Sequence, residues 1–381
     1  QQEVLIGSFS DTELHEVVNE LYIDDMVDIM EEMPANVVKR ILENSDANTR
    51  QLINEILKYP PDSAGSIMTT EFITLHASMT VGEAIKRIRE KGLDSETIET
   101  CYVTDSVRHL IGFVTIRTII LSDENAKIED VMNRNVISVS TTEDQEAVAN
   151  LFAKYDLTVL PVVDNEKRIV GIVTVDDAID VLQKETTEDI EKMAAITPTD
   201  KPYLKKTAYE IWKSRIPWLL ILMISATFTG MIISHFEDAL KAYVILTAYI
   251  PMLMDTGGNS GSQTSVTVIR SLSLHELSFS DVFRVVWKEF RVAFLCSITL
   301  ALVYFLKLML FDGTGIYVAL VICITLIVTV FVAKLVGCIL PMAARKIGFD
   351  PAVMASPFIT TIVDAISLLI YFNIASLVLR I

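Results

Sequence analysis

Apolar residues form five long runs in the second half of the chain, whereas in the first half they recur in short periodic patterns. A bilayer core takes about 20 apolar residues in a helix, so each long run predicts one membrane helix in contact with lipid. These spans are approximately Ile216–Ser234, Ala239–Leu253 with a continuation to Ile269, Val292–Phe311, Ile316–Met342 and Pro351–Leu379. Lys and Arg gather before the first span and in the loops after the second and fourth. The positive-inside rule therefore places the N-terminal half in the cytoplasm and the C-terminus outside.

Residues 10–58 carry apolar stripes at i, i+3 and i+4, separated by Pro34 and by polar breaks. This spacing is typical of amphipathic helices. The stripes look like the last part of a helical superhelix, so we expect a truncated helical N-terminal domain over residues 1–60. Acidic residues crowd one of its helices, between Asp24 and Glu32. A solvated face is the simplest interpretation of that crowding.

Residues 62–184 contain an internal repeat of about 60 residues. Each copy predicts a strand, an amphipathic helix, two strands joined by a turn, and a helix. The order resembles a tandem CBS pair, a regulatory module that often binds adenine nucleotides. The ribose-binding pattern of that module is met by Thr174 and Asp177 in the second copy, whereas Thr118 replaces the acidic residue in the first. The resemblance therefore supports at most one nucleotide site in the pair, with ATP as the candidate ligand.

The two halves of the chain differ sharply in charge. Residues 1–200 carry 39 Asp and Glu against 17 Lys and Arg, and the remainder carries 10 against 15. An acidic surplus excludes nucleic acid as a partner, because phosphates need basic side chains; it fits cation binding or good solubility. The four cysteines form no CxxC pair and the five histidines show no metal-ligand spacing. Neither a zinc site nor a disulfide framework is expected.

The connector between the halves is a predicted helix rich in carboxylates, with seven in the sixteen residues 176–191. Several of them are three or four residues apart, as Asp177 and Asp180 are, and like charges at those spacings weaken an isolated helix. The arrangement becomes favourable when a divalent cation bridges it to another acidic surface. A solvated linker helix is the alternative interpretation.

The segment Pro251–Gln263 is unusually polar for a membrane span and holds three glycines. We expect these residues to weaken or break the helix at membrane depth, which requires protein or water around the freed carbonyls. Asp255 and Asn259 add hard oxygen ligands, which suit magnesium or calcium. The alternative is a helix-packing seam of small residues.

Asp364 lies near the middle of the last span, and it is the only acidic or basic residue between Asp350 and Arg380. An unpaired carboxylate there is costly unless it faces water or a cation. One such residue per chain, doubled across a two-fold axis, would suit a hydrated magnesium ion. The alternative is a packed, protonated aspartate or one paired with Lys334. Asp350 comes fourteen residues earlier, at the expected cytoplasmic mouth.

Taken over nearly its whole length, the chain resembles the MgtE family of magnesium channels. The most specific matches are Asp255-Thr256-Gly257-Gly258-Asn259 with Gln263, and Gly348-Phe349-Asp350-Pro351-Ala352 followed by Asp364. The resemblance implies a homodimer with its pore on the two-fold axis, between the second and fifth spans. It assigns hydrated Mg²⁺ to Asp364, the mouth to Asp350, and places Asp255 where a family member has a glycine whose carbonyl faces the ion. The implied pore lining is Gly257, Gly258, Asn259 and Thr360.

The resemblance also implies that intracellular Mg²⁺ binds the cytoplasmic domains and closes the pore. The positions that it assigns to this sensing are Glu146, Asp156, Asp177, Asp180, Glu185, Glu188 and Asp189, together with Asp24 and Asp28 in the helical domain. Mg²⁺ is thus expected both as the transported ion and as the regulator, with influx through the plasma membrane driven by potential and gradient.

The expected fold class is multidomain α+β joined to an all-α membrane domain. Its parts are a partial helical N domain over 1–60, CBS copies over 62–122 and 128–184, an acidic connecting (plug) helix over 185–212, and a five-helix transmembrane domain over 213–381. Alternatives to the channel are a CBS-regulated, proton-coupled carrier, a CBS-regulated anion channel, which the central Asp364 disfavours, and a membrane-bound sensor. An enzyme is the weakest alternative, because no nucleophile–base pair or phosphate-cradling loop is present.

Overall fold

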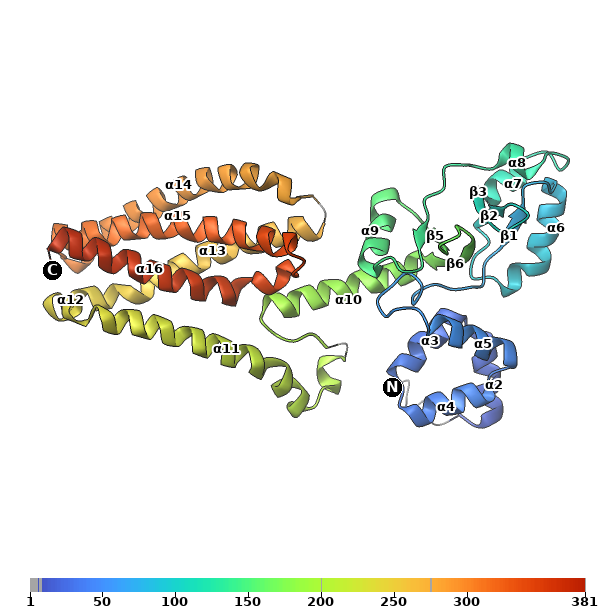
Figure 1. The fold of residues 1–381 in the computed structure, drawn as a ribbon, viewed down its shortest axis with the longest axis horizontal. Helices are drawn as coiled ribbons and strands as arrows, with labels where there is room; N and C mark the ends of the chain where they lie inside the picture. Colours follow the sequence, from blue (N-terminus) through green and yellow to red (C-terminus); the bar gives the residue numbers. More distant parts are fainter. Residues whose placement is uncertain (1–5, 7–8, 200, 275, 381) are drawn as a thin grey trace. The chain divides into compact units, whose positions relative to one another are not determined.

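A computed structural model describes residues 6, 9–199, 201–274 and 276–380 (Figure 1). The chain divides into two compact units, Gln1–Glu185 and Thr186–Ile381, each of which has its own hydrophobic clusters.

Between residues 9 and 57, the described part of the first unit contains four ten-residue helices: α2 (Asp11–Glu20), α3 (Ile23–Glu32), α4 (Ala35–Asn44) and α5 (Ala47–Ile56). Local sequence sets their starts. Ser10 and Glu13 form a capping box at α2, Pro34 precedes α4, and the Asp46 side chain accepts a hydrogen bond from the backbone N–H of Thr49 at α5. The apolar stripes meet in one core that contains Leu14, which confirms the helices predicted over residues 10–58.

Two three-stranded sheets follow, and they share one topology. The first copy contains β1 (Thr74–His76), α6 (Val81–Lys91), the 3₁₀ turn η1 (Gly92–Asp94), β2 (Thr100–Thr104), β3 (Leu110–Thr115) and α7 (Ile116–Leu121). After α8 (Ile128–Val131), the second contains β4 (Val139–Ser140), α9 (Gln145–Tyr155), β5 (Val159–Val163), β6 (Ile169–Thr174) and α10 (Val175–Met193). In each sheet the first strand is parallel to the middle one, which is antiparallel to the third. The structure thus confirms the order of elements predicted from the repeat.

The segment before each copy pairs with the sheet of the other copy. Thr69 bridges Ile172 on β6, and Asn133 bridges Phe113 on β3. Glycine is required at both crossings, because a Cβ would lie too close to the backbone of the crossing segment: 2.9 Å from the Asn133 carbonyl oxygen at Gly112, and 2.8 Å from that of Thr69 at Gly171. The neighbouring Met132 and Met68 side chains fill the remaining space at these two glycines. This exchange explains why methionine and glycine recur at matching places in the repeat.

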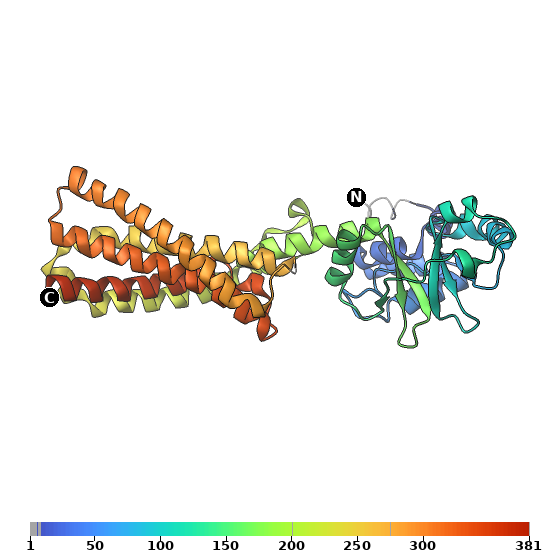
Figure 2. The same cartoon turned by 90° about the horizontal axis from the view of Figure 1, so that it is seen from above.

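The second unit begins with the end of α10 and is helical apart from its loops. Its long helices are α11 (Ala208–His235), α13 (Ile250–Ser273), α14 (Val282–Lys307), α15 (Ile316–Lys346) and α16 (Ser356–Leu379), and α13 to α16 run alongside one another (Figures 1 and 2). Shorter elements join them: η2 (Tyr203–Lys205), α12 (Glu237–Ala242), η3 (Val244–Tyr249), η4 (Phe279–Asp281), η5 (Leu308–Asp312) and η6 (Pro351–Met354). Among the described residues, four helices are long and apolar enough to span a membrane: Ala208–His235, Phe279–Asp312, Ile316–Lys346 and Pro351–Leu379.

The expected break of the second span at its glycines is wrong. Helix α13 is continuous through Gly257, Gly258 and Gly261 for 24 residues, and Pro251 lies in its first turn, where the missing N–H costs no helical hydrogen bond. The irregular backbone lies just before it, in η3.

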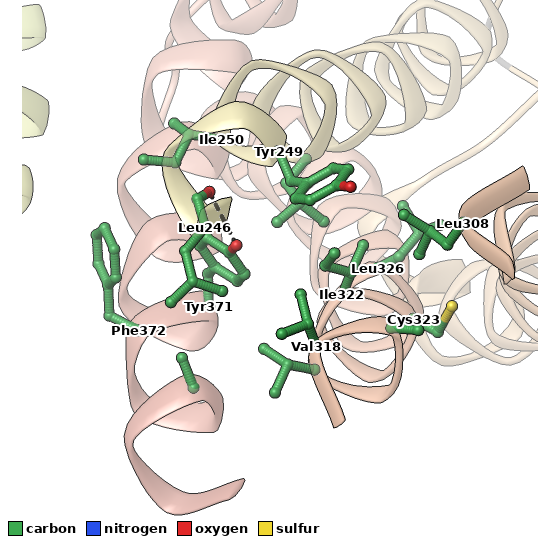
Figure 3. Close-up of a cluster of buried hydrophobic side chains, with 14 of the residues drawn as sticks. Leu246, Tyr249, Ile250, Leu308, Val318, Ile322, Cys323, Leu326, Tyr371 and Phe372 are labelled. Carbon is green, nitrogen blue, oxygen red and sulfur yellow. Dashed lines mark hydrogen bonds between the residues drawn. The ribbon is translucent and has the colours of Figure 1, made fainter. Parts of the chain in front are cut away.

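A buried apolar cluster holds this junction between η3 and α13 (Figure 3). Leu246 and Ile250 pack with Ile322 of α15 and Phe372 of α16, and all four side chains are at most 7% exposed. The Tyr371 hydroxyl donates a 3.0 Å hydrogen bond to the Leu246 carbonyl oxygen. This contact ties the 3₁₀ segment to α16 inside the apolar cluster.

Candidate functional site

One face of α13 is polar and exposed in the single chain. Asp255, Asn259, Gln263 and Thr267 follow one another at every fourth residue, and all four are exposed. Residues four apart lie on the same side of a helix, so these side chains form one stripe of carboxylate, amide and hydroxyl groups, here called the polar face. Its oxygen atoms are suited to a hydrated divalent cation.

The opposite side of α13 carries the glycines, which pack against neighbouring helices. A Cβ at Gly257 would lie 2.7 Å from the Thr329 methyl group, and one at Gly258 would lie 2.9 Å from that of Thr360. A Cβ at Gly337 on α15 would collide with the carbonyl oxygen of Gly261, so the two backbones touch. Gly257 and Gly258 are buried, so in the single chain they pack against neighbouring helices as a small-residue seam does. The pore-lining role that the resemblance implies for them remains a prediction.

Asp364 lies on α16 and is half-buried. Asp255 acts on it electrostatically, so α13 and α16 bring two carboxylates near each other. The hydroxyl groups of Thr360 and Thr361 donate to the Pro357 carbonyl oxygen, at 3.0 and 2.9 Å. In the described part of the chain, no basic side chain forms an ion pair with Asp364. The alternative that paired it with Lys334 is wrong, because Lys334 lies 3.8 Å from Glu289 instead.

The connecting helix is shorter than expected. Helix α10 ends at Met193, Ala195 has a left-handed backbone (φ 54°), and α11 begins only at Ala208. In the described residues of the range 185–212, α-helix therefore covers only the beginning and the end, with the short 3₁₀ turn η2 between them. The left-handed residue and the two prolines that follow it interrupt α-helical hydrogen bonding.

The end of α10 contacts the segment before α16 through Lys192, a residue that our sequence analysis missed. Its ammonium nitrogen lies 2.5 Å from a Glu188 carboxylate oxygen and 2.7 Å from one of Asp350. Asp189 accepts a 3.4 Å hydrogen bond from the hydroxyl of Ser273. Burial opposes the charge on Lys192, but its hydrogen bonds to Asp350 and Glu188 hold its pKa above the ordinary value. Burial, followed by the charge of Asp350, raises the pKa of Asp189.

Three carboxyl groups in the first unit interact although they are far apart in sequence. Burial, with the charge of Asp177, raises the pKa of Asp24 on α3 to about 8. The same two causes raise the pKa of Glu96, which follows η1, to about 7. Burial raises the pKa of Asp177 itself to about 6, although hydrogen bonds from Thr174 oppose this. Asp24, Asp177 and Asp28, which also acts on Asp177, were predicted from the sequence; Glu96 was not.

The remaining sensing candidates lie on α9 and α10. Glu146 is in the first turn of α9, and Asp156 ends that helix in the left-handed conformation (φ 52°). Asp180 is exposed on α10, and Glu185 accepts a 2.8 Å hydrogen bond from the Gln145 side chain. Within the described residues, no group of three or more His, Cys, Asp or Glu side chains has the geometry of a metal site.

The nucleotide motif of the second CBS copy is ordered. The Thr174 hydroxyl and backbone N–H both donate to one carboxylate oxygen of Asp177. This contact holds the acidic side chain at the start of α10, directly after β6, which is where the ribose-binding pattern places it.

Comparison with known proteins finds matches along most of the chain. A family model described as a divalent cation transporter matches residues 250–374, the MgtE intracellular N domain matches 1–62, and the CBS domain matches 64–124 and 128–184. The magnesium transporter MgtE of Thermus thermophilus is 39% identical over 94% of this chain and 80% of its own length. That of Bacillus subtilis is 35% identical over 98% and 82%.

Two solved structures resemble the N-terminal part. The soluble part of a magnesium transporter is 34% identical and covers 48% of this chain and 72% of its own, with a TM-score of 0.47. The cytosolic domain of the Mg²⁺ channel MgtE in complex with ATP is 37% identical and covers 47% and 78%, with a TM-score of 0.43.

Proposed function

We propose that this chain, which belongs to the MgtE family of divalent cation transporters, conducts Mg²⁺ passively through the plasma membrane into the cytoplasm. The observation that carries this proposal is the half-buried Asp364 next to the polar face of α13, with Asp255 as its electrostatic neighbour. Mg²⁺ releases its waters reluctantly, and proteins usually hold it with one or two carboxylates. A potential of 100 mV supplies about 2.3 kcal/mol per charge, and twice that for a divalent ion.

The proposal includes a homodimer. Asp255, Asn259 and Gln263 are exposed in the single chain, and polar side chains in contact with lipid are costly. A second copy that covers this face would give the side chains an aqueous path and bring two Asp364 carboxylates to one axis. The first half of the chain then lies in the cytoplasm and the C-terminus outside, as the distribution of basic residues indicates.

Regulation forms the second part of the proposal. Mg²⁺ binds carboxylates of the cytoplasmic half and stabilises the closed state. When Mg²⁺ is scarce, these carboxylates repel one another, and the repulsion favours the open state. Two observations support this: the raised pKa values of Asp24, Glu96 and Asp177 show that their charges are poorly compensated, and Lys192 ties the connector to Asp350. The Thr174–Asp177 contact supports ATP as a ligand of the second CBS copy.

The test is Mg²⁺ uptake into proteoliposomes. We expect Asp364→Ala to lower uptake at least tenfold, because it removes the carboxylate at midplane. Asp238→Ala is the matched control, since this aspartate of α12 is fully exposed and should leave uptake unchanged. Wild-type uptake by the Asp364 variant would remove the pore assignment. A reversal potential that follows the pH gradient would favour the proton-coupled carrier instead.

A further inference from the structure

A charged group is buried inside the helical bundle, away from Asp364. Lys334 on α15 is 5% exposed and is the only basic residue that is buried among the described residues. Twelve residues, about 18 Å of helix, separate it from the end of α15 at Lys346. An ammonium group at that depth is strongly destabilising unless it has partners.

Its partners come from two other helices. The Lys334 ammonium donates a 3.2 Å hydrogen bond to the hydroxyl of Thr264 on α13 and lies 3.8 Å from a carboxylate oxygen of Glu289 on α14. The Thr264 hydroxyl in turn donates a 2.9 Å hydrogen bond to the same Glu289 oxygen. The three side chains, here called the triad, therefore form a chain of directional, charge-assisted bonds across three helices.

Near the triad, the contacts of α13 are mostly made by small buried residues. At Gly261 and Gly337 its seam with α15 is formed by the two backbones, with no side chains to interlock at that level. A slip of one residue along the seam moves a helix by about 1.5 Å and turns each side chain by about 100°. Such a slip would carry Asp255 and the rest of the polar face away from Asp364.

We propose that the triad is a positioning device that fixes the rotation of α13 and so determines how the transporter discriminates between divalent cations. Thr264 is the link to α13, and it is one residue beyond Gln263 of the polar face. Glu289 and Lys334 act through Thr264 and do not touch the ion. This inference rests on the proposed function only in its consequence for selectivity, because the rotation of α13 can be measured separately.

The first test compares Thr264→Val, which keeps the shape but removes the hydroxyl, with Thr264→Ser, which keeps the hydroxyl. Uptake of Mg²⁺ and Mn²⁺ is measured in proteoliposomes. We expect Thr264→Val to change the Mg²⁺/Mn²⁺ uptake ratio by about fivefold or more, since a hydrogen bond to a charged group is lost, and Thr264→Ser to restore it. Thr299→Val is the matched control, because this exposed threonine bonds only within its own helix, to Leu295.

The second test needs no transport. The labelling rate of Gln263→Cys by a membrane-impermeant thiol reagent, in a Cys296→Ser background, reports whether the polar face is exposed to water. We expect Thr264→Val to change this rate several-fold and Thr299→Val to leave it unchanged. If Thr264→Val and Thr299→Val give the same uptake ratio and the same labelling rate, the positioning role proposed for the triad is overturned. If Asp364→Ala transports normally, the proposed function fails while the labelling still decides the triad.

A paired variant guards against a trivial loss of folding. Glu289→Leu with Lys334→Met removes both charges together, and apolar residues of similar volume often replace a buried ion pair without loss of stability. We expect this folded variant to shift the uptake ratio and the labelling rate as Thr264→Val does, because Thr264 has lost its charged partners. Wild-type behaviour of the pair would contradict the proposal.

Discussion

Lys192→Met tests whether the ion pairs of Lys192 with Glu188 and Asp350, at the proposed pore mouth, stabilise the closed state. The substitution keeps the length of the side chain but removes the ammonium that lies between Glu188 and Asp350. When cytoplasmic Mg²⁺ is absent, the closed state of the wild type still has the Lys192 ammonium between the two carboxylates. In the variant the ammonium is missing, and the two carboxylates repel each other. The variant should therefore open more often when internal Mg²⁺ is absent.

The size of the effect follows from the exposure of the three side chains, which ranges from 25% for Lys192 to 36% for Asp350. Ion pairs that water partly screens contribute about 0.5–1 kcal/mol each. Two of them give about 1–2 kcal/mol, which corresponds to about a 5- to 30-fold change in the ratio of closed to open protein. A saturating concentration of internal Mg²⁺ should close the variant again, because the freed carboxylates can bind the ion.

The assay is channel current or Mg²⁺ uptake with internal Mg²⁺ varied from a chelated zero upward. We expect a raised baseline at zero Mg²⁺ and a steeper decline as Mg²⁺ increases. Lys201→Met is the control, since it removes an ion pair with Glu210 that is well exposed. A baseline equal to that of wild type would refute the reasoning, because the contact would then not contribute to closure.

Three further outcomes can be checked. Gly337→Ala should destabilise the protein by about 1–3 kcal/mol in thermal unfolding, whereas Gly230→Ala, which has open space around it, should not. Asp177→Asn should weaken ATP binding about tenfold or more by calorimetry, because it removes the charged acceptor of the nucleotide motif; equal affinity would exclude that site. The pKa values of Asp24 and Glu96 are raised to about 8 and about 7 in the folded protein, so above about pH 4 the folded state binds more protons than the unfolded state. With Mg²⁺ removed by a chelator, the resistance of the first unit to protease should therefore fall as pH rises from 6 to 8. A rise in resistance would contradict this prediction.

Much of the fold could be predicted because it depends on local patterns. The apolar stripes before residue 58 produced four helices, and the repeat produced two sheets with the same strand order. Asp364 could be chosen as a candidate because an acidic residue in an apolar span is costly wherever it lies, whereas Asp24 and Asp177 were chosen through the family resemblance. These inferences need no knowledge of which segments meet in space.

The residues that were missed depend on contacts between distant segments. Glu96 is an ordinary loop glutamate until α3 and the start of α10 surround it with carboxylates. Lys192 is recognisable in sequence only as a helical partner of Glu188, since its contact with Asp350 requires the fold. The same holds for Glu289, which appears in sequence to be one charge among the basic residues of a loop.

Helix α13 shows how one segment can satisfy two opposed requirements, and why its sequence was misread. Its buried side must be nearly bare, because only glycine lets the backbones of α13 and α15 touch at Gly261 and Gly337. Its exposed side must be polar if Asp255 is to accompany Asp364 along a wet path. Glycines and polar residues alternate every few positions along α13, and this lowers its mean hydropathy. For that reason α13 is not among the four apolar spans found in the described residues. The same glycines that weaken a helix in isolation thus allow close packing, and this packing, not an unwound backbone, brings the two carboxylates near each other.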